Sequence, residues 1–303
     1  MKTVLIAGGS GLVGQRLSEL LDKKNYQVIL LSRRKNLNAR FPTYQWNLDE
    51  GTIDSEAIEQ ANYIINLAGA GIADKRWSSK RKKEIIDSRV KSNELIANKI
   101  KGSKHLKAFL GAAAIGYYGN RGDQLMKESD VSGKSGFLAE SCIAWEKSFE
   151  KINMTTVRTV IIRIGVVLST KGGALEKMLL PAKFGLGSYF GNGSQYFSWI
   201  HIDDICQMFI DGIEKENMNG VFNGVAPNPV TNKEITQSIN KVSSRFGVLL
   251  PVPEFALRLA MGEMADVVLH STRVSAEKML KQGFSFQFPD LEPALNDLLV
   301  RKI

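Results

Sequence analysis

The sequence predicts an α/β protein with a doubly wound parallel (Rossmann) sheet and a smaller, mostly helical C-terminal cap domain. Short apolar runs alternate with helical patterns through about residue 165, as in a parallel sheet with crossover helices. Beyond it the pattern is irregular and contains a cluster of helix breakers at 226–231. We expect residues 1–170 plus 196–224 to form the Rossmann domain, and 171–195 plus 225–303 to form the substrate-binding cap.

The first strand and the glycines after it predict a dinucleotide site. Val4–Ala7 is an uninterrupted apolar run, typical of a strand buried on both faces. Gly8 allows the sharp turn, Gly11 leaves room for a diphosphate at the helix start, and Gly14 lets the helix pack on the sheet. An ordinary glycine turn is the alternative, but strand, helix and second strand frame this one. The expected cofactor contacts here are Gly8, Gly11, Leu12, Val13 and Gly14.

The end of the second strand, Gln27–Leu31, favours NADP(H) over NAD(H). The strand runs into Ser32-Arg33-Arg34, where an NAD-preferring protein usually has a carboxylate for the ribose hydroxyls. A hydroxyl and guanidinium groups instead suit a 2′-phosphate. We therefore expect Ser32 and Arg33 to bind that phosphate, although surface arginines that merely end a loop are the alternative.

The remaining elements of the Rossmann domain follow in order. The expected strands are 43–46, 61–67, 106–114, 157–164 and 221–224, with long helices at 79–101 and 136–151. The loops after these strands should reach the cofactor, because ligands bind at the carboxyl ends of parallel strands. The residues expected to contact it are Asn47 and Leu48 at the adenine, Leu67, Ala68 and Gly69, and Arg163, an unusual charge within an apolar strand.

The cap should consist of short helices. Gly172-Gly173 opens a helix through Leu180, and further helices are expected near 255–264, 274–280 and 291–300. Asp203 or Asp204 is the expected N-cap of a helix over 205–213, and Thr231 with Glu234 has capping-box spacing.

Composition restricts the class of protein. The hydrophobic fraction of 44% is that of a globular protein, and no apolar run approaches the ~18 residues of a membrane span. The strand at Thr3 leaves no room for a signal peptide, and two cysteines make no disulfide framework, so we expect a cytoplasmic protein. The three histidines lack the spacing of a metal site.

The net charge of +9 comes from one stretch, because residues 75–107 hold twelve Lys or Arg and three acids. A solvated helix is the simplest interpretation. An anionic substrate near Arg81, Lys82 and Arg89 is the alternative. No nucleic-acid-binding motif accompanies the charge, so we expect neither a nucleic-acid nor a membrane partner.

Taken together, the motifs resemble the extended short-chain dehydrogenase/reductase superfamily, and within it an epimerase-like branch related to chloroplast and cyanobacterial division factors. The superfamily pattern is matched by the glycines at 8, 11 and 14, Asn66–Gly69, Tyr118-Gly119 and 201–204. The branch is matched by blocks along the whole chain: Arg76-Trp77, 88–90, Trp145-Glu146, 172–175, 197–201, 226–231, 262–266 and Gly283-Phe284. The resemblance implies the fold and a nicotinamide cofactor, but not the chemistry.

The catalytic groups of that superfamily are absent. In register, its Tyr-x-x-x-Lys pair falls on Cys142 and Glu146, and its third hydroxyl falls among Ala112–Ala114. Substitute catalytic groups would be Tyr117, Tyr118 or Glu146. The alternatives are that both rings line the cleft and that Glu146 pairs with Arg163 or Arg89. Cys142 is expected to be a packing thiol, since Glu146 would raise its pKa.

Two functional hypotheses remain. The first is an NADP(H)-binding epimerase- or oxidoreductase-like enzyme for an unidentified, possibly anionic small molecule, held by Trp77, Arg89, Trp145, Trp199 and His201. The second is a non-catalytic NADP(H) sensor or protein-binding factor, in which a protein partner replaces turnover. Either a monomer or a dimer fits the sequence.

Overall fold

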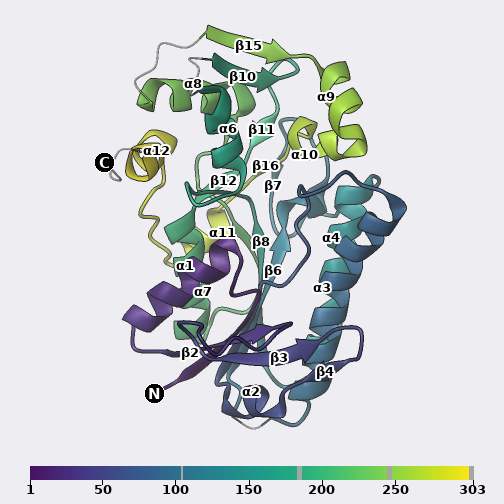
Figure 1. The fold of residues 1–303 in the computed structure, drawn as a ribbon. Coiled ribbons are helices and arrows are strands. Elements are labelled where there is room, and N and C mark those ends of the chain that lie inside the picture. Colours follow the sequence, from purple (N-terminus) through teal and green to yellow (C-terminus); the bar gives the residue numbers. More distant parts are fainter. Residues whose placement is uncertain (104, 183–185, 244–247, 300–303) are drawn as a thin grey trace.

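An eight-stranded sheet runs through the centre of the computed structural model, which describes residues 1–303 except 104, 183–185, 244–247 and 300–303 (Figure 1). The strand order is β13-β8-β6-β5-β1-β2-β3-β4, and all neighbours are parallel except β3 and β4. The bounds are β1 (Thr3–Ala7), β2 (Gln27–Ser32), β3 (Thr43–Asn47), β4 (Thr52–Ile53), β5 (Tyr63–Asn66), β6 (Ala108–Ala114), β8 (Arg158–Ile164) and β13 (Gly220–Gly224). The predicted parallel sheet is confirmed.

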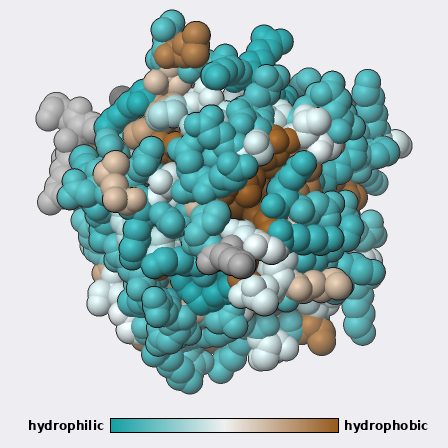
Figure 2. Space-filling model, turned by 90° about the horizontal axis from the view of Figure 1, so that it is seen from below, coloured by the Kyte–Doolittle hydropathy of each residue, from teal (hydrophilic) through white to brown (hydrophobic). Residues whose placement is uncertain are grey.

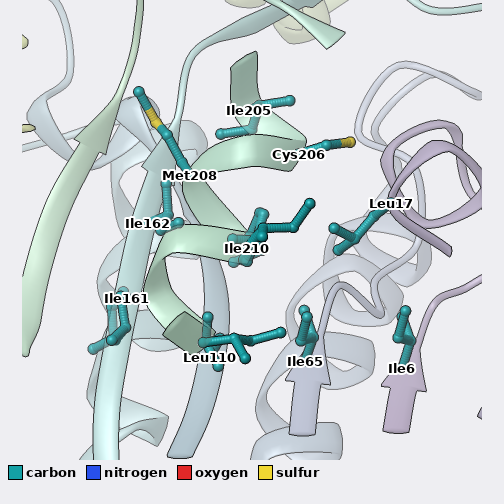
Figure 3. Packing of buried hydrophobic residues seen from close by; sticks show 14 of the residues in the cluster. Ile6, Leu17, Ile65, Leu110, Ile161, Ile162, Ile205, Cys206, Met208 and Ile210 are labelled. Carbon is teal, nitrogen blue, oxygen red and sulfur yellow. The ribbon is translucent and has the colours of Figure 1, made fainter. Parts of the chain in front are cut away.

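Helices cover both faces of this sheet. One face carries α1 (Leu12–Lys23) and α7 (Ile202–Glu214), which pack on each other. The other carries α2 (Ser55–Gln60), α3 (Ser79–Ile100), α4 (Phe137–Ser148) and α5 (Glu150–Asn153), so the single helix expected over 136–151 is interrupted at Phe149. Figure 3 shows Met208 and Ile210 of α7 among strand residues such as Leu110, with Leu17 of α1 alongside. These side chains are fully buried, which makes α7 part of the main core.

The cap is mostly helical and lies beyond the carboxyl edge of the sheet (Figure 1). Its helices are α6 (Ala174–Ala182), α8 (Asn232–Val242), α9 (Glu254–Met261), α10 (Asp266–Leu269), α11 (Glu277–Lys281) and α12 (Leu291–Leu299), with the 3₁₀ turn η2 (Gly262–Ala265). A second 3₁₀ turn, η1 (Ile115–Tyr118), follows β6 in the sheet domain. Two strand pairs join the cap to the rest: β7 (Leu125–Met126) with β16 (Arg273–Val274), and β11 (Tyr196–Phe197) with β14 (Val230–Thr231). A third pair, β10 (Leu186–Phe190) with β15 (Val248–Val252), lies within the cap, and a fourth, β9 (Val166–Leu168) with β12 (Trp199–His201), lies outside it. The sequence did not predict these pairs, because most of the strands are too short to show a period.

The N-cap of α7 differs from the prediction. His201 caps this helix, since its Nδ1 accepts the Asp203 N–H at 3.1 Å. Asp203 instead binds the guanidinium of Arg16 through both oxygens, at 2.6 and 2.9 Å. The Asp203 or Asp204 cap was therefore wrong, whereas the capping box of Thr231 and Glu234 is confirmed.

The surface seen from below is mainly hydrophilic, with hydrophobic residues gathered in a hollow near the middle of that face (Figure 2). Within the part of the chain that the structure describes, no helix has the length and apolar character needed to cross a membrane.

Candidate functional site

The turn between β1 and α1 is built from glycines with distinct roles. Gly8 has φ +83°, and a Cβ there would lie 2.7 Å from the Leu67 carbonyl carbon. A Cβ on Gly14 would lie 2.3 Å from the Gly8 carbonyl oxygen, so α1 could not pack as it does. Gly11 caps α1 without any side-chain bond, and its one close neighbour is the Gly8 oxygen, 3.3 Å from a Cβ placed there. The first amides of α1, including those of Leu12 and Val13, thus face a cradle that an anion would fit.

The loop after β5 is held beside this turn by buried amides. Asn66 Nδ2 donates to Ser92 Oγ at 3.0 Å and to Asn93 Oδ1 at 2.7 Å, and its Oδ1 accepts the Ala68 N–H at 3.0 Å. A Cβ on Gly69 would lie 2.9 Å from the Arg89 guanidinium carbon. Leu67, Ala68 and Gly69 therefore run in a fixed path next to Gly8.

The end of β2 presents free cations. Arg33 and Arg34 are exposed, and neither takes part in an ion pair with the described residues. Ser32 Oγ accepts the Arg34 N–H at 3.3 Å, which leaves its hydroxyl proton available to a ligand. This is the arrangement a 2′-phosphate requires.

The Asn47 side chain forms hydrogen bonds within its own loop. Its Oδ1 accepts the N–H groups of Asp49 and Glu50, at 3.0 and 3.3 Å. The oxygen expected to accept from an adenine amino group is thus occupied, and only the amide N–H₂ remains to meet a base. Leu48, half-buried against the core, is placed beside it.

Arg163 and Glu146 form a buried ion pair. Arg163 Nε and Nη2 donate to the two carboxylate oxygens of Glu146 at 2.7 and 2.8 Å, and Nη1 donates to the Tyr118 hydroxyl at 2.8 Å. Its guanidinium carbon lies 3.7 Å from the ring centre of Tyr117. Tyr118 in turn donates to Asn223 Oδ1 at 2.7 Å. One closed network ties α4, η1, β8 and β13 together.

This network overturns several predicted roles. Arg163 is 3% exposed and all its bonds are internal, so it does not bind the cofactor as expected. Tyr118 is fully buried, and burial raises its pKa to about 12 although Arg163 acts in the opposite direction. Tyr117 packs on Arg163, and Glu146 has both oxygens bound. None of the three expected catalytic groups lines the cleft; the alternative pairing of Glu146 with Arg163 is what the structure has.

A cavity of about 210 Å³ lies between the sheet and the cap. Its sheet side is formed by the ends of β6 and β8 and by α3 and α4, with Ala114, Gly165, Cys142 and Trp145 among its walls. Its cap side is formed by β11 and the segment 266–272. Burial raises the pKa of Cys142 to about 12, with Glu146 adding to the effect and Arg89 opposing it, so this thiol is no nucleophile.

Arg89 is the cation of this cavity. Its guanidinium lies 4.7 Å from the Trp145 ring centre, and Nη1 donates to the carbonyls of Ala70 and Ile85 at 2.9 and 3.0 Å. Burial lowers its pKa, and within the described residues it has no carboxylate partner. The other two cations expected near an anionic substrate already have acidic partners. Arg81 pairs with Asp74 and Glu84, and Lys82 pairs with Glu263.

Three expected substrate contacts lie outside the cavity. Trp77 donates from its indole to the Ile72 carbonyl at 2.8 Å and packs edge-on against Phe137. Trp199 is fully buried and donates to the Asn228 carbonyl at 3.1 Å. His201, 1% exposed, caps α7. Each of these side chains binds backbone and none lines this cavity, which corrects their predicted place in it.

The cap wall of the cavity holds two residues that the sequence does not predict as site residues. His270 and Asp266 line it, with Nε2 of the imidazole 3.5 Å from Oδ1 of the carboxylate. In the sequence, the block 262–266 contributes only to the family resemblance, and the histidines are considered only as metal ligands or structural residues. The four-residue spacing of Asp266 and His270 across a helix end was the available signal.

The sheet, the glycine turn and the cavity at the carboxyl edge define a Rossmann-type protein of the extended short-chain dehydrogenase/reductase kind. The chain belongs to the NAD dependent epimerase/dehydratase family, whose model matches residues 4–223; a second model, a domain of unknown function (DUF1731), matches 252–298. The predicted family is confirmed.

Similar proteins span nearly the whole chain. Epimerase family protein YfhF of Bacillus subtilis is 36% identical over 98% of this chain and 97% of its own length. The crystal structure of human epimerase family protein SDR39U1 (isoform 2) with NADPH is 30% identical, covers 98% of both chains and has a TM-score of 0.87. UDP-N-acetylglucosamine 4-epimerase of Bacillus cereus, at 15% identity and TM-score 0.78, shares the fold.

Proposed function

We propose that this protein is an NADP(H)-dependent oxidoreductase with an epimerase-like fold that acts on a small anionic carbonyl or alcohol compound. The open cradle at Gly11 and the unpaired Arg33 support a bound NADP(H). The NADPH in the similar human structure supports the same cofactor.

Arg89 is the residue that indicates an anionic substrate. A half-buried guanidinium without an acid among the described residues, stacked on Trp145 and lining the cavity, is best satisfied by an anionic group of a ligand. The cavity volume of about 210 Å³ favours a small molecule over a nucleotide sugar.

The chain's residues would hold the two reactants together at the sheet edge. Bound NADPH supplies a hydride to a carbonyl carbon, or its oxidised form accepts one from an alcohol. We expect the nicotinamide between the loop 67–69 and the segment 164–168, where Ala114 and Gly165 line the cavity. Arg89 would orient the substrate by its anion, and the cap would exclude water.

The test is a fluorescence titration with NADPH and NADH, followed by addition of glyoxylate as reducible probe and oxamate as its unreactive analogue. We expect tight NADPH binding by the wild type, loss of binding in Gly11→Val, and weaker oxamate binding in Arg89→Gln with NADPH affinity unchanged. Lys83→Gln on the exposed face of α3 is the matched control. Equal oxamate affinity in Arg89→Gln and wild type would contradict the anion site.

A non-catalytic NADP(H) sensor is the second candidate. It is favoured by the side chains that occupy the usual catalytic positions: Cys142 is an inert thiol and Glu146 is locked to Arg163. NADPH binding without turnover of any carbonyl compound, together with a change in protease sensitivity of the cap, would favour this role.

A further inference from the structure

Reduction of a carbonyl requires a proton as well as a hydride. On the sheet side of the cavity, among the described residues, the one hydroxyl is that of Ser141, which donates to the Leu138 carbonyl at 2.9 Å. The superfamily's tyrosine position carries Cys142, whose pKa is raised to about 12, and its third hydroxyl position falls on alanines, of which Ala114 reaches the cavity. Tyr118 and Glu146 are engaged elsewhere.

The cap side of the cavity carries a side chain that can donate a proton, His270. His270 follows α10 directly, its side chain is 22% exposed, and it lines the same cavity as Arg89 and Cys142. Its Nε2 lies 3.5 Å from Asp266 Oδ1, while its Nδ1 is buried and has no hydrogen-bond partner among the described residues. An imidazole with one nitrogen facing a carboxylate and the other unengaged is a common general acid–base arrangement.

The carboxylate is itself fixed in place. Arg258 Nη1 of α9 donates to Asp266 Oδ1 at 3.1 Å, and the backbone N–H of His270 donates to the Asp266 carbonyl at 3.1 Å. Arg258 thus holds the Asp266 carboxylate, and the backbone bond fixes where His270 leaves the helix. The other charged or titratable groups among the described residues that line the cavity are Arg89, Cys142 and Tyr196, and Arg273 lies over the Tyr196 ring.

We propose that His270, oriented by Asp266, is the general acid and base of this protein, and that it faces a substrate whose anionic group binds Arg89. As the carbonyl carbon takes up hydride from NADPH, the C=O electron pair moves to oxygen. That oxygen takes the imidazolium proton, and the neutral ring is reprotonated by water. The products are an alcohol and NADP⁺; oxidation runs the same steps in reverse. This inference rests on the proposed function.

The test uses histidine NMR, because the chain has three histidines. Protein labelled with [¹⁵N]histidine and saturated with NADPH is titrated from pH 5 to 9 with and without oxamate, and the signals are assigned with His105→Asn, His201→Asn and His270→Asn. We expect oxamate to move the ring ¹⁵N signals of His270 and to leave those of His105 and His201 unchanged. Asp266→Asn should reduce that movement, whereas a purely structural ion pair would not respond to oxamate.

Affinity and turnover give independent readouts. Oxamate should bind more weakly above the titration midpoint of His270, and His270→Gln should abolish this pH dependence, with the exposed His105→Gln as control. Reduction of glyoxylate should fall by about 10²- to 10⁴-fold in His270→Gln at unchanged NADPH affinity. Oxamate binding with an unmoved His270 signal, or full turnover by His270→Gln, would overturn this inference alone. Failure of NADPH or oxamate to bind would overturn the proposed function as well.

Discussion

Glu146 and Arg163 form a two-bond ion pair at the position where related dehydrogenases carry their catalytic lysine. The pair joins α4 to β8 through bonds of 2.7 and 2.8 Å, and its side chains are 12% and 4% exposed. Because the Glu146 carboxylate accepts two hydrogen bonds from the Arg163 guanidinium, we expect Glu146 to stabilise the fold.

Replacing Glu146 by lysine should therefore destabilise the protein. Glu146→Lys places a cation beside Arg163 in a buried site, and we expect the free energy of unfolding to fall by about 3 kcal/mol or more. Urea unfolding measures the loss. Glu140→Lys, an exposed reversal on the same helix, is the control and should change stability by less than about 1 kcal/mol. Similar losses in both variants would show that the ion pair is unimportant.

Both cysteines should be unreactive in the folded protein. Burial raises the pKa of Cys142 to about 12 and that of Cys206 as well, so little thiolate exists at neutral pH. Ellman's reagent should label neither thiol under native conditions and both in urea. Rapid labelling of native Cys142 would instead mark it as a reactive group.

Arg33 should determine the preference between the two nicotinamide cofactors. Loss of a charge-assisted bond to the 2′-phosphate is expected to weaken NADPH binding by about 10- to 100-fold in Arg33→Ala, with NADH binding almost unchanged. Titrations with both nucleotides measure this. Arg40→Ala is the control, since Arg40 binds Asp22 at 2.8 Å. Equal weakening of both nucleotides would argue against a 2′-phosphate site.

Gly14 should tolerate no side chain, in contrast to Gly11. Gly14→Ala forces a Cβ to within 2.3 Å of the Gly8 carbonyl oxygen, and displacement of α1 should cost about 1–3 kcal/mol. In Gly11→Ala the same oxygen is 3.3 Å away, so the loss should be smaller. Thermal unfolding of the two variants compares them, and an equal loss would contradict the assigned roles.

His201 should make stability depend on pH. Burial lowers its pKa in the folded protein, and Asp203 and Asp297 oppose this only in part. Below about pH 6.5 the unfolded chain then binds more protons than the folded one, so stability falls as the pH drops, by at most ~1.4 kcal/mol per pH unit.

His201→Asn keeps an oxygen to accept the Asp203 N–H and removes this titration. Urea unfolding between pH 7 and 5 should show a shallower slope for His201→Asn than for wild type. The exposed His105→Asn should retain the wild-type slope, and identical slopes in all three proteins would contradict the prediction.

The Rossmann sheet was predictable because its signals are local. The run Val4–Ala7 and the glycines after it lie within a dozen residues, and each later strand is a short apolar run followed by a helix. The cap strands β10 and β15 were not predictable, since their pairing joins segments sixty residues apart. The boundaries of the two domains stay a prediction.

The cleft was predictable on one side only. Arg89 and Trp145 belong to helices whose positions follow from the sheet, and both line the cavity. Tyr118 and Trp199 looked available in the sequence but are fully buried, because burial depends on neighbours distant in the chain. His270 needed the fold of the cap before it could be placed opposite Arg89.

The Asp204 carboxylate of α7 accepts the backbone N–H groups of Gln287 and Phe288, at 2.8 and 3.0 Å. Asp204 is 2% exposed, so a charge inside the first matched region is solvated by backbone from the second. A chain truncated after the first region would lack these two N–H groups, and the Asp204 carboxylate would lose both hydrogen bonds. The two regions should therefore fold as one unit, and neither should be stable when expressed alone.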